Sequence, residues 1–414
     1  MRSTVWRESR NRSKRRRLLR RLFWASGIVI LLFAITVGLV LLHHSSAKTN
    51  FIPSVERSTK ASVAPQYTSL QGRYLINGTI FWGRAIERVS LAANDFGYTL
   101  RNLSTFNPSA YDAWIADLEC PVANMTVPYQ RQVDLLSFNC LPEFAPAYVK
   151  YFQIIGLANN HTGNQGQAAF LETQQNLTAA GAQVYGSYDP SDAQNRCEVI
   201  SLPIKLQRSD GQQSKSALPV AFCGFHYVGR MPLPGELEYI TQYAKIMPTI
   251  ATVHMGIEYT AQATPNQVTV AHGLIDAGAD FVVMNHPHWV QNTEVYKGKL
   301  IMYSVGNFIF DQLTAEELRS ASLDVTMNIP YNQNLAKWLA LNNSCKAIEL
   351  HDNCLAAAQA AHLQKPKVKY TFALVVGDSL TDQWVPQKAN PTIQQAVEQR
   401  TNWADTIKKL QSGE

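Results

Sequence analysis

Residues 251–312 read ATVHMGIEYTAQATPNQVTVAHGLIDAGADFVVMNHPHWVQNTEVYKGKLIMYSVGNFIFDQ, and this stretch decides the fold. Two apolar runs, one ending at His254 and one ending at His286, are typical of buried strands. Between them, residues 266–277 carry apolar side chains at helical spacing, and Gly278 is suited to a left-handed helix cap. The stretch is therefore predicted to form a strand, a helix and a second strand, with histidines after each strand.

Three histidines of this stretch, His254, His286 and His288, are predicted to lie on one rim of a sheet, where α/β proteins usually bind their ligands. Pro287 stiffens the backbone between the last two, and side chains two residues apart in an extended segment share a face. A single histidine is more often a surface residue or a satisfied core residue. Three of the ten in the chain on one rim instead favour a metal site.

Two carboxylates end another predicted strand, Trp114–Glu119, before Pro121 stops it. Asp117 and Glu119 are two residues apart, so they point the same way from a strand, which suits a divalent metal. The alternative is a polar strand end that opens a loop. Taken alone, the stretch favours neither reading.

An asparagine and histidine pair, Asn160 and His161, follows a predicted strand at residues 151–157 and precedes a helix at residues 167–180. Such a loop can place a side-chain carbonyl on a metal and an imidazole on a leaving group. Asparagine is also a common turn former and helix cap, so the pair is weak evidence by itself.

The remaining pattern favours one large layered α/β domain. The fold is predicted to begin near Gly72, with a first strand at residues 73–80. Later predicted elements are a strand at 299–310 that turns at Gly306, an inserted helical hairpin at 336–363, a strand at 368–376 and a polar helix at 392–410. We find no glycine-rich phosphate loop and no serine-hydrolase elbow, so nucleotide-loop and serine-hydrolase functions lose support.

The N-terminus predicts a membrane anchor. Residues 1–21 are strongly basic, and residues 22–42 contain no charged side chain over a length of about 30 Å, enough to cross a bilayer. The basic flank should stay cytoplasmic, which places the main domain outside the membrane. Residues 45–47 are small enough for a signal peptidase, so a cleaved signal peptide is the alternative. Residues 43–70 have the composition of a stalk.

Charge gives no sign of nucleic-acid binding, and the cysteine content agrees with export. The formal net charge of +6 comes from the basic N-terminus, and the rest of the chain is mildly acidic, which gives no reason to expect nucleic-acid binding. Six cysteines suit an exported protein in which some form disulfides. They allow fifteen connectivities, and the sequence does not choose among them.

Six short motifs occur in an order that resembles the poly-γ-glutamate capsule biosynthesis protein CapA family, a branch of the calcineurin-like metallophosphoesterases. The resemblance covers about residues 72–312. Each motif is weak by itself, and their shared order makes the resemblance specific. They are Gly78–Arg84 (GTIFWGR), Asp117–Glu119 (DLE), Ala158–His161 (ANNH), His254–Tyr259 (HMGIEY), Asn285–His288 (NHPH) and Tyr303–Phe308 (YSVGNF).

The resemblance implies a four-layer α/β/β/α metallophosphatase-like sandwich over residues 71–330, followed by an extension at 331–414. It also implies a metal centre among the loops at one end of the two sheets. In the implied metal centre, Glu119 bridges two metals, one bound by Asn160, His254 and His286 and the other by His288. His161 is implied to be the general acid or to stabilise phosphate charge. Glu258 and Arg84 are implied to contact the substrate.

One position departs from the family pattern. The first motif usually has an aspartate that binds a metal, and here Thr79 stands in its place. A neutral hydroxyl is a poor replacement for an anionic ligand, so we expect one divalent metal, Mn, Fe or Zn, rather than two. Asp117 stands where the family more often has asparagine, and this extra carboxylate is expected to compensate in part.

The resemblance and the anchor together imply a single-pass cell-membrane protein that acts in synthesis, export or attachment of poly-γ-glutamate or a similar anionic polymer. The implied partners are the cytoplasmic membrane, the polymer and other membrane subunits of a polymer synthesis complex. Two alternatives remain. One is an extracytoplasmic metallophosphoesterase acting on small or lipid-linked phosphates, and the other is a non-catalytic polymer-binding scaffold.

Overall fold

The computed structural model describes residues 66–193, 196–342, 345 and 351–413. The predicted basic segment 1–21, the predicted transmembrane anchor 22–42 and the predicted stalk up to residue 65 lie outside the described residues. Among the helices that are described, none is both long enough and apolar enough to span a bilayer.

The described chain is a mixed α/β fold with a fourteen-stranded sheet. Its strands are β1 (Tyr67–Ile80), β2 (Ala113–Leu118), β3 (Phe152–Gly156), β4 (Gln183–Tyr185), β5 (Cys197–Arg208), β6 (Gln213–His226), β7 (Thr249–His254), β8 (Phe281–Asn285), β9 (Thr293–Tyr296), β10 (Lys299–Met302), β11 (Asn307–Ile309), β12 (Arg319–Pro330), β13 (Lys369–Asp378) and β14 (Gln387–Lys388). Its α-helices are α2 (Arg84–Ala92), α3 (Tyr129–Asp134), α4 (Ala145–Val149), α5 (Gly166–Ala179), α6 (Thr241–Ala244), α7 (Pro265–Asp276), α8 (Gln333–Leu341), α9 (His351–Ala360), α10 (Pro391–Thr401) and α11 (Trp403–Ser412).

Strand β1 is the point where the sheet divides. Its first half pairs antiparallel with β5 and β12, whereas its second half pairs parallel with β2 and β11. One branch continues as β2, β3 and β4, and the other as β5, β6, β7, β8, β10 and β9. Because β2, β3 and β4 are parallel to the end of β1, and β7 and β8 are parallel to the end of β6, the strand ends that carry polar side chains converge.

Alternate side chains of β1 enter two different apolar cores, as a strand with both faces buried requires. Tyr74 and Ile76 belong to the larger core, which also contains side chains of β5 to β8, β12 and α7. Leu75 and Ile80 belong to the second core, which is rich in aromatic side chains from β2, β3 and the segments around α4. The two branches therefore share the second half of β1, where every residue from Tyr74 to Ile80 is buried.

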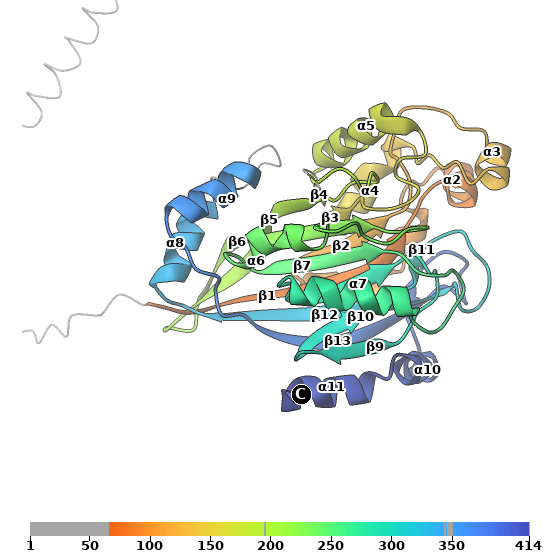
Figure 1. Ribbon diagram of the computed structural model, residues 1–414. Helices are drawn as coiled ribbons and strands as arrows, with labels where there is room; N and C mark the ends of the chain where they lie inside the picture. The colour runs from red at the N-terminus through yellow and green to blue at the C-terminus, as the bar shows by residue number, and fades with distance from the viewer. Residues whose placement is uncertain (1–65, 194–195, 343–344, 346–350, 414) are drawn as a thin grey trace, which may run out of the picture. The chain divides into compact units, whose positions relative to one another are not determined.

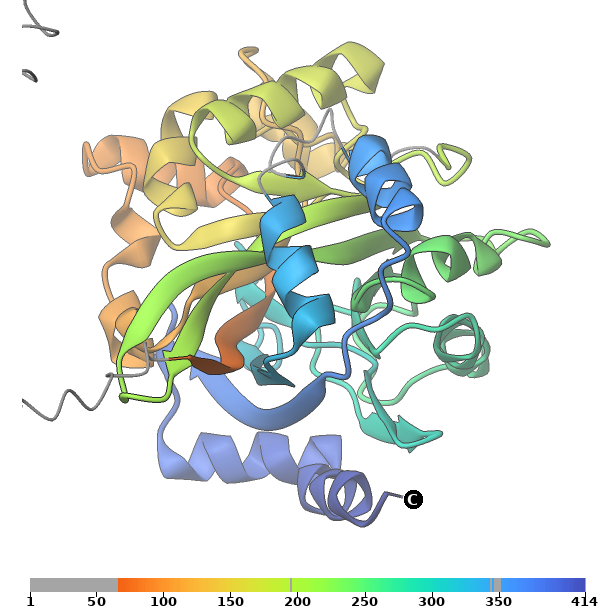
Figure 2. The ribbon, with the colours of Figure 1, turned by 90° about the vertical axis from the view of Figure 1, so that its left-hand side faces the viewer.

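Helices cover the sheet on several sides (Figure 1). α4 contacts β3, α5 contacts β4, and α7 contacts β8. α8 and α9 contact β6 and β5 at the end of the molecule where β1 begins, as Figure 2 shows from that side. α10 contacts β13, and α11 contacts β9 and β10. At the opposite end, where β1 finishes, loops lie beside α2 and α3 (Figure 1).

Three predicted boundaries were wrong. β1 begins at Tyr67, so the last residues of the predicted stalk lie in the sheet, because β5 and β12 pair with both edges of β1 there. The predicted strand 299–310 does turn at Gly306, which has a φ of +70°, but the turn divides it into two strands: β10 pairs with β8, and β11 pairs with β1. The predicted single C-terminal helix is α10 and α11, which are separated by Asn402 in a left-handed conformation.

The six cysteines form three disulfides, Cys120–Cys140, Cys197–Cys223 and Cys345–Cys354. The sequence left this connectivity open. Cys197 and Cys223 are opposite residues of the antiparallel pair β5 and β6, so this bond follows from the strand register. The first bond closes next to Glu119 and therefore concerns the site.

Candidate metal centre

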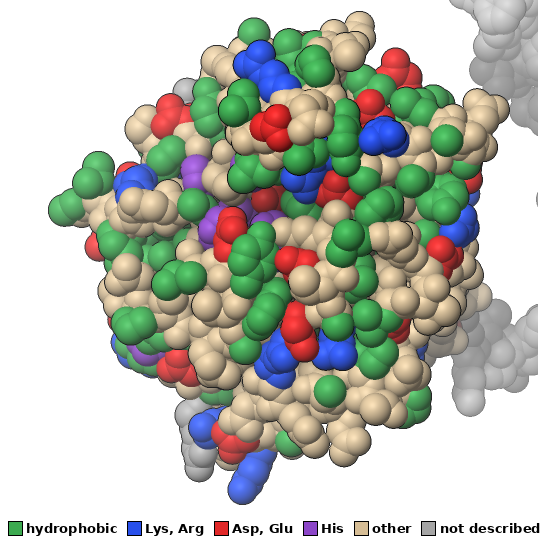
Figure 3. Space-filling view, turned by 90° about the vertical axis from the view of Figure 1, so that its right-hand side faces the viewer, with side chains coloured by type: hydrophobic (Ala, Val, Ile, Leu, Met, Phe, Trp, Pro, Cys, Tyr) green, Lys and Arg blue, Asp and Glu red, His purple; other side chains and the backbone are tan. Residues whose placement is uncertain are grey.

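Polar side chains gather where strands of both branches end. Thr79 of β1 is the register partner of Asp117 of β2, and His226 of β6 is the register partner of His254 of β7. Figure 3 shows the face on which β1 finishes: histidine side chains lie in a hollow with acidic side chains beside them and hydrophobic side chains around. The arrangement agrees with the predicted rim of His254, His286 and His288, and it adds residues that the sequence pattern did not single out.

Asp117 joins the two branches of the sheet. Its Oδ2 atom accepts hydrogen bonds from Asn159 Nδ2 at 3.0 Å and from Thr79 Oγ1 at 3.4 Å, and it lies 3.1 Å from His254 Nδ1. Ligand atoms of Asp117, Glu119 and His254 lie within 4.8 Å of one another, a spacing that could hold a metal ion. Asp117 therefore contacts both Thr79 and His254, and its expected compensation for the missing anionic ligand stays a prediction.

Glu119 is 1% exposed and lies between two imidazoles. Its Oε1 atom is 3.9 Å from His161 Nε2 and 3.8 Å from His288 Nε2, and its Oε2 atom has no hydrogen-bond partner. Separations of this size are too long for hydrogen bonds. The separation from His288 is compatible with two ligand atoms of one cation, and the role of Glu119 as a metal ligand stays a prediction.

The proton position on His288 follows from its neighbour Asn307. The amide nitrogen of Asn307 donates to the carbonyl oxygen of Glu317 at 3.3 Å, so its oxygen faces His288 Nδ1 at 2.8 Å. An amide oxygen only accepts, and His288 therefore carries its proton on Nδ1. The Nε2 lone pair is left facing Glu119, which is the arrangement that outer partners impose on metal-binding histidines.

His161 has the same arrangement. The side-chain oxygen of Asn164 accepts the backbone N–H of Phe138 at 2.8 Å and lies 3.0 Å from His161 Nδ1. Since that oxygen can only accept, the proton of His161 is on Nδ1 and its Nε2 is bare on the side of Glu119. His161 is thus brought to the same carboxylate as His288.

His226 is a site histidine that the sequence reasoning missed. Its Nδ1 lies 2.8 Å from the carbonyl oxygen of Tyr188, so the proton is on Nδ1, and its Nε2 is buried without a hydrogen-bond partner. Its ring centre is 6.5 Å from that of His254. The only signal in the sequence was its position at the end of an apolar run, at residues 218–225, which resembles the position of His254.

The His-Pro-His segment holds its rings in an unusual backbone conformation. His286 and His288 have φ values of +100° and +59°, which side-chain-bearing residues seldom adopt and which concentrate at functional sites. The His286 ring is 5.0 Å from that of His254, and its Nδ1 is buried without a partner. The Oδ1 atom of Asn160 is also buried and unpartnered. These atoms match the expected ligand set of Asn160, His254 and His286, whose metal binding stays a prediction.

Burial disfavours charge throughout this site. It raises the pKa of Asp117 to about 7 and the pKa of Glu119 well above its usual value. Burial also lowers the pKa of His161 to about 4, of His286 to about 2 and of His254 well below its usual value, so these imidazoles are neutral at pH 7. Neutral imidazoles and buried carboxylates are the groups that bind a divalent cation, and the residues present fit such an ion.

The two residues expected to contact substrate have different surroundings. The guanidinium of Arg84 pairs with Asp311 and lies 4.5 Å from the centre of the Phe138 ring, so its charge is already engaged. The side chain of Glu258 is 42% exposed and lies 4.0 Å from His286 Nε2. Glu258 is therefore accessible to a substrate. The guanidinium of Arg84 is instead held in an ion pair with Asp311.

The pH dependence of metal binding should come from the carboxylates. Burial raises the pKa of Glu119, so protons compete with a cation for this carboxylate as the pH falls. Burial also raises the pKa of Asp117 to about 7, so the carboxylate that contacts His254 loses its charge in slightly acidic solution. The histidines have lowered pKa values and add no such competition. We expect manganese affinity, measured by titration calorimetry, to fall at least about tenfold from pH 8 to pH 6. An affinity that stays constant over this range would contradict the assignment.

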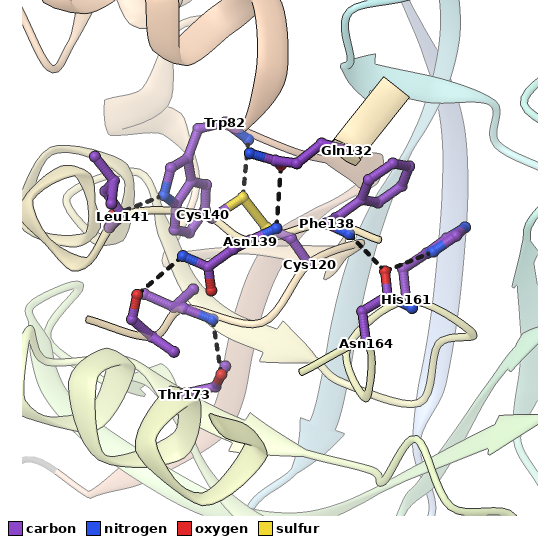
Figure 4. The surroundings of a disulfide bond; sticks show 12 residues. Trp82, Cys120, Gln132, Phe138, Asn139, Cys140, Leu141, His161, Asn164 and Thr173 are labelled. Atoms are coloured by element: carbon purple, nitrogen blue, oxygen red, sulfur yellow. Dashed lines mark hydrogen bonds between the residues drawn. A yellow bond between two sulfur atoms is a disulfide. The ribbon is translucent and has the colours of Figure 1, made fainter. Parts of the chain in front are cut away.

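A disulfide lies beside the candidate site (Figure 4). Cys120 directly follows Glu119 and is bonded to Cys140, whose Sγ atom also accepts the backbone N–H of Trp82 at 3.4 Å. The neighbouring Phe138 donates to Asn164, the residue that orients His161. One covalent link therefore fixes the segment beside Glu119 and the partner of His161.

The comparisons with known proteins agree on one family. The family model described as "Bacterial capsule synthesis protein PGA_cap" matches residues 73–207 and 237–312, just over half of the chain. The capsule biosynthesis protein CapA of Bacillus anthracis is 26% identical over 258 residues, covering 57% of this chain and 59% of that protein. The PGA biosynthesis protein CapA of Bacillus subtilis (strain 168) is 31% identical over 175 residues, covering 39% and 43%.

More distant similarities were also found. A probable polyglutamine synthesis accessory protein of Mycobacterium tuberculosis is 25% identical over 171 residues, covering 38% of this chain and 45% of that protein. A solved structure from Thermus thermophilus superposes with a TM-score of 0.32 at 10% identity, covering 61% of this chain and 94% of that chain. The matched stretches span about half the length of the curated relatives.

Proposed function

Because the chain belongs to the bacterial capsule synthesis protein family PGA_cap, we propose that it acts in the synthesis, export or attachment of poly-γ-glutamate or a similar anionic polymer. The names of the two Bacillus relatives, which refer to capsule and PGA biosynthesis, support this pathway. Family membership confirms the resemblance drawn from the six ordered motifs. The polymer itself, the membrane subunits that would join the protein and the reaction are parts of the proposal.

The proposal places the folded part of the chain on the outer side of the cytoplasmic membrane. The uncharged residues 22–42 and the basic flank before them support a single-pass anchor. Three disulfides suit that compartment, because the cytoplasm keeps most thiols reduced. In the expected four-layer sandwich, the two branches that share β1 would be the two inner layers.

The observation that carries the proposed chemistry is the group of bare imidazole nitrogens that face Glu119 and its surroundings. Glu119, Asn160, His254, His286 and His288 would hold one divalent cation, with manganese, iron or zinc as the candidates. When bound, such a cation supplies Lewis acid chemistry at a phosphoryl or acyl centre. Since the folded part is mildly acidic, a cation would also give an anionic polymer a positive contact.

His161 is better suited to accept a proton than to donate one. A general acid needs a proton on the nitrogen that faces the reacting group, and His161 carries its proton on Nδ1, where Asn164 holds it. Burial lowers the pKa of His161 to about 4, so Nε2 stays unprotonated at neutral pH. This geometry favours proton acceptance, and the role implied by the family, general acid or stabiliser of phosphate charge, stays a prediction.

The test is a deletion of the chain from its source organism, followed by measurement of polymer on the cell surface. We expect the surface polymer to be lost, and to return with the wild-type chain but not with His254→Ala. His272→Ala is the matched control, because His272 pairs with Glu294 and stacks on Tyr296, neither of which is a candidate site residue.

Each alternative gives a different result in this experiment. Unchanged surface polymer after the deletion would contradict the pathway and favour a phosphoesterase acting on small or lipid-linked phosphates. The supporting observation for that function is the close spacing of ligand atoms from Asp117, Glu119 and His254. Full restoration by His254→Ala would favour a polymer-binding scaffold that needs no metal. The scaffold alternative is supported by Thr79, which stands in place of the usual anionic ligand.

A further inference from the structure

The geometry points to a positioning role for Asp117: together with Thr79 and Asn159, it fixes which nitrogen of His254 is free to bind a cation. This inference rests on the proposed metal centre but concerns the protein's own hydrogen bonds. It assigns Asp117 as the partner that orients a ligand, rather than as a ligand, and it gives Thr79 a function of its own.

The orientation of Asn159 is the first step. Its side-chain oxygen lies 2.8 Å from the backbone nitrogen of His161, and a backbone N–H can only donate. The oxygen must therefore face His161, which turns the amide nitrogen toward Asp117 at 3.0 Å. Asn159 is 0% exposed, so no water competes for this arrangement.

The proton between Asp117 and His254 is the second step. His254 Nδ1 lies 3.1 Å from Asp117 Oδ2 and 3.3 Å from the amide nitrogen of Asn159, which can only donate. In its ionised form Asp117 has no proton to give, so the hydrogen at the 3.1 Å contact then belongs to the imidazole. His254 is 2% exposed, and its Nε2 atom is buried without any hydrogen-bond partner. The lone pair of Nε2 is therefore directed into the site, as in the carboxylate, histidine and metal arrangement of other metalloproteins.

Thr79 completes the arrangement from the neighbouring strand. It is the register partner of Asp117, and its hydroxyl lies 3.4 Å from the same Oδ2 atom, which accepts from Asn159 and His254. A donor at this position steadies the carboxylate. An aspartate here would instead place a second anion against Asp117, which costs free energy unless another cation lies between them.

The test measures the tautomer of His254 and metal affinity in the full chain. Two-bond proton–nitrogen NMR spectra of the metal-free protein, labelled with ¹⁵N in histidine, report which ring nitrogen carries the proton, and His254→Gln identifies the signal. We expect the Nδ1–H form in the wild type and the Nε2–H form in Asp117→Ala. We also expect Asp117→Ala to weaken manganese binding about 10- to 100-fold.

Asp117→Asn is the conservative variant, because its side-chain oxygen can still accept from His254. It should keep the Nδ1–H form and weaken manganese binding much less than Asp117→Ala. Thr79→Val, which removes only the hydroxyl, provides a second probe with a smaller loss, and thermal unfolding checks that each variant folds.

Two results would overturn the inference. One is an unchanged tautomer in a folded Asp117→Ala variant. The other is an Asp117→Asn variant that keeps the tautomer but loses as much affinity as Asp117→Ala, because this would make Asp117 a ligand. If the tautomer changes as expected but the wild type binds no metal, the positioning role stands and the proposed metal centre fails.

Discussion

Replacing His254 with alanine is expected to reduce the metal affinity of the chain by at least about 100-fold. Removing a residue that only hydrogen-bonds to a metal ligand already reduces affinity about 10- to 100-fold, and His254 is expected to be a ligand itself. His254 is buried, its Nε2 is unpartnered, and its ring centre lies 5.0 Å from that of His286. Metal analysis and calorimetry of the purified full chain, with manganese, iron and zinc in turn, would measure the change. The wild type is expected to bind one equivalent.

The control for this experiment is His272→Ala, which removes a histidine outside the site. It should leave affinity and stoichiometry unchanged, since His272 contacts Glu294 and Tyr296. Equal metal content in wild type and a correctly folded His254→Ala variant would refute the assignment of this histidine. A wild-type chain that binds none of the three metals would remove the centre altogether and favour the scaffold.

Gly78→Ala is expected to have the largest effect on stability, about 3 kcal/mol of lost unfolding free energy. A Cβ atom at Gly78 would overlap the carbonyl oxygen of Gly306 and lie 2.9 Å from its carbon. Both are backbone atoms, and Thr79 N–H donates to the same oxygen at 3.1 Å, so the crossing of β1 and the turn before β11 cannot easily relax. Denaturant unfolding of the full chain would measure the loss.

Gly97→Ala is the matched control for Gly78→Ala. A Cβ atom there would meet only the flexible Asp95 side chain at 3.3 Å, and no left-handed backbone is required. We expect a change within about 0.5 kcal/mol. Equal stability of the two variants would mean that the backbone where β1 passes Gly306 relaxes to accommodate the added Cβ atom. Because Thr79 and Asn307 flank this crossing, Gly78→Ala should weaken metal binding as well.

The local sequence determined much of the site. Apolar runs that end in His254 and His286 were sufficient to predict strands with histidines on one rim, because hydrophobic periodicity and chain order are local properties. Glu119, Asn160 and His161 were found in the same way, at predicted strand ends. The order of six motifs identified the family before any geometry was known.

Tertiary structure alone decided how these parts combine. Asp117 and His254 are 137 residues apart and meet only because β1 joins the two branches. Likewise, the sequence predicted the turn at Gly306 within residues 299–310, but only strand pairing shows that β10 joins β8 whereas β11 joins β1. The tautomers of His161, His254 and His288 depend on Asn164, Asp117 and Asn307, whose orientations are fixed by further hydrogen bonds. Register and proton position arise from pairing between distant segments, and a local pattern of residue types does not contain that information.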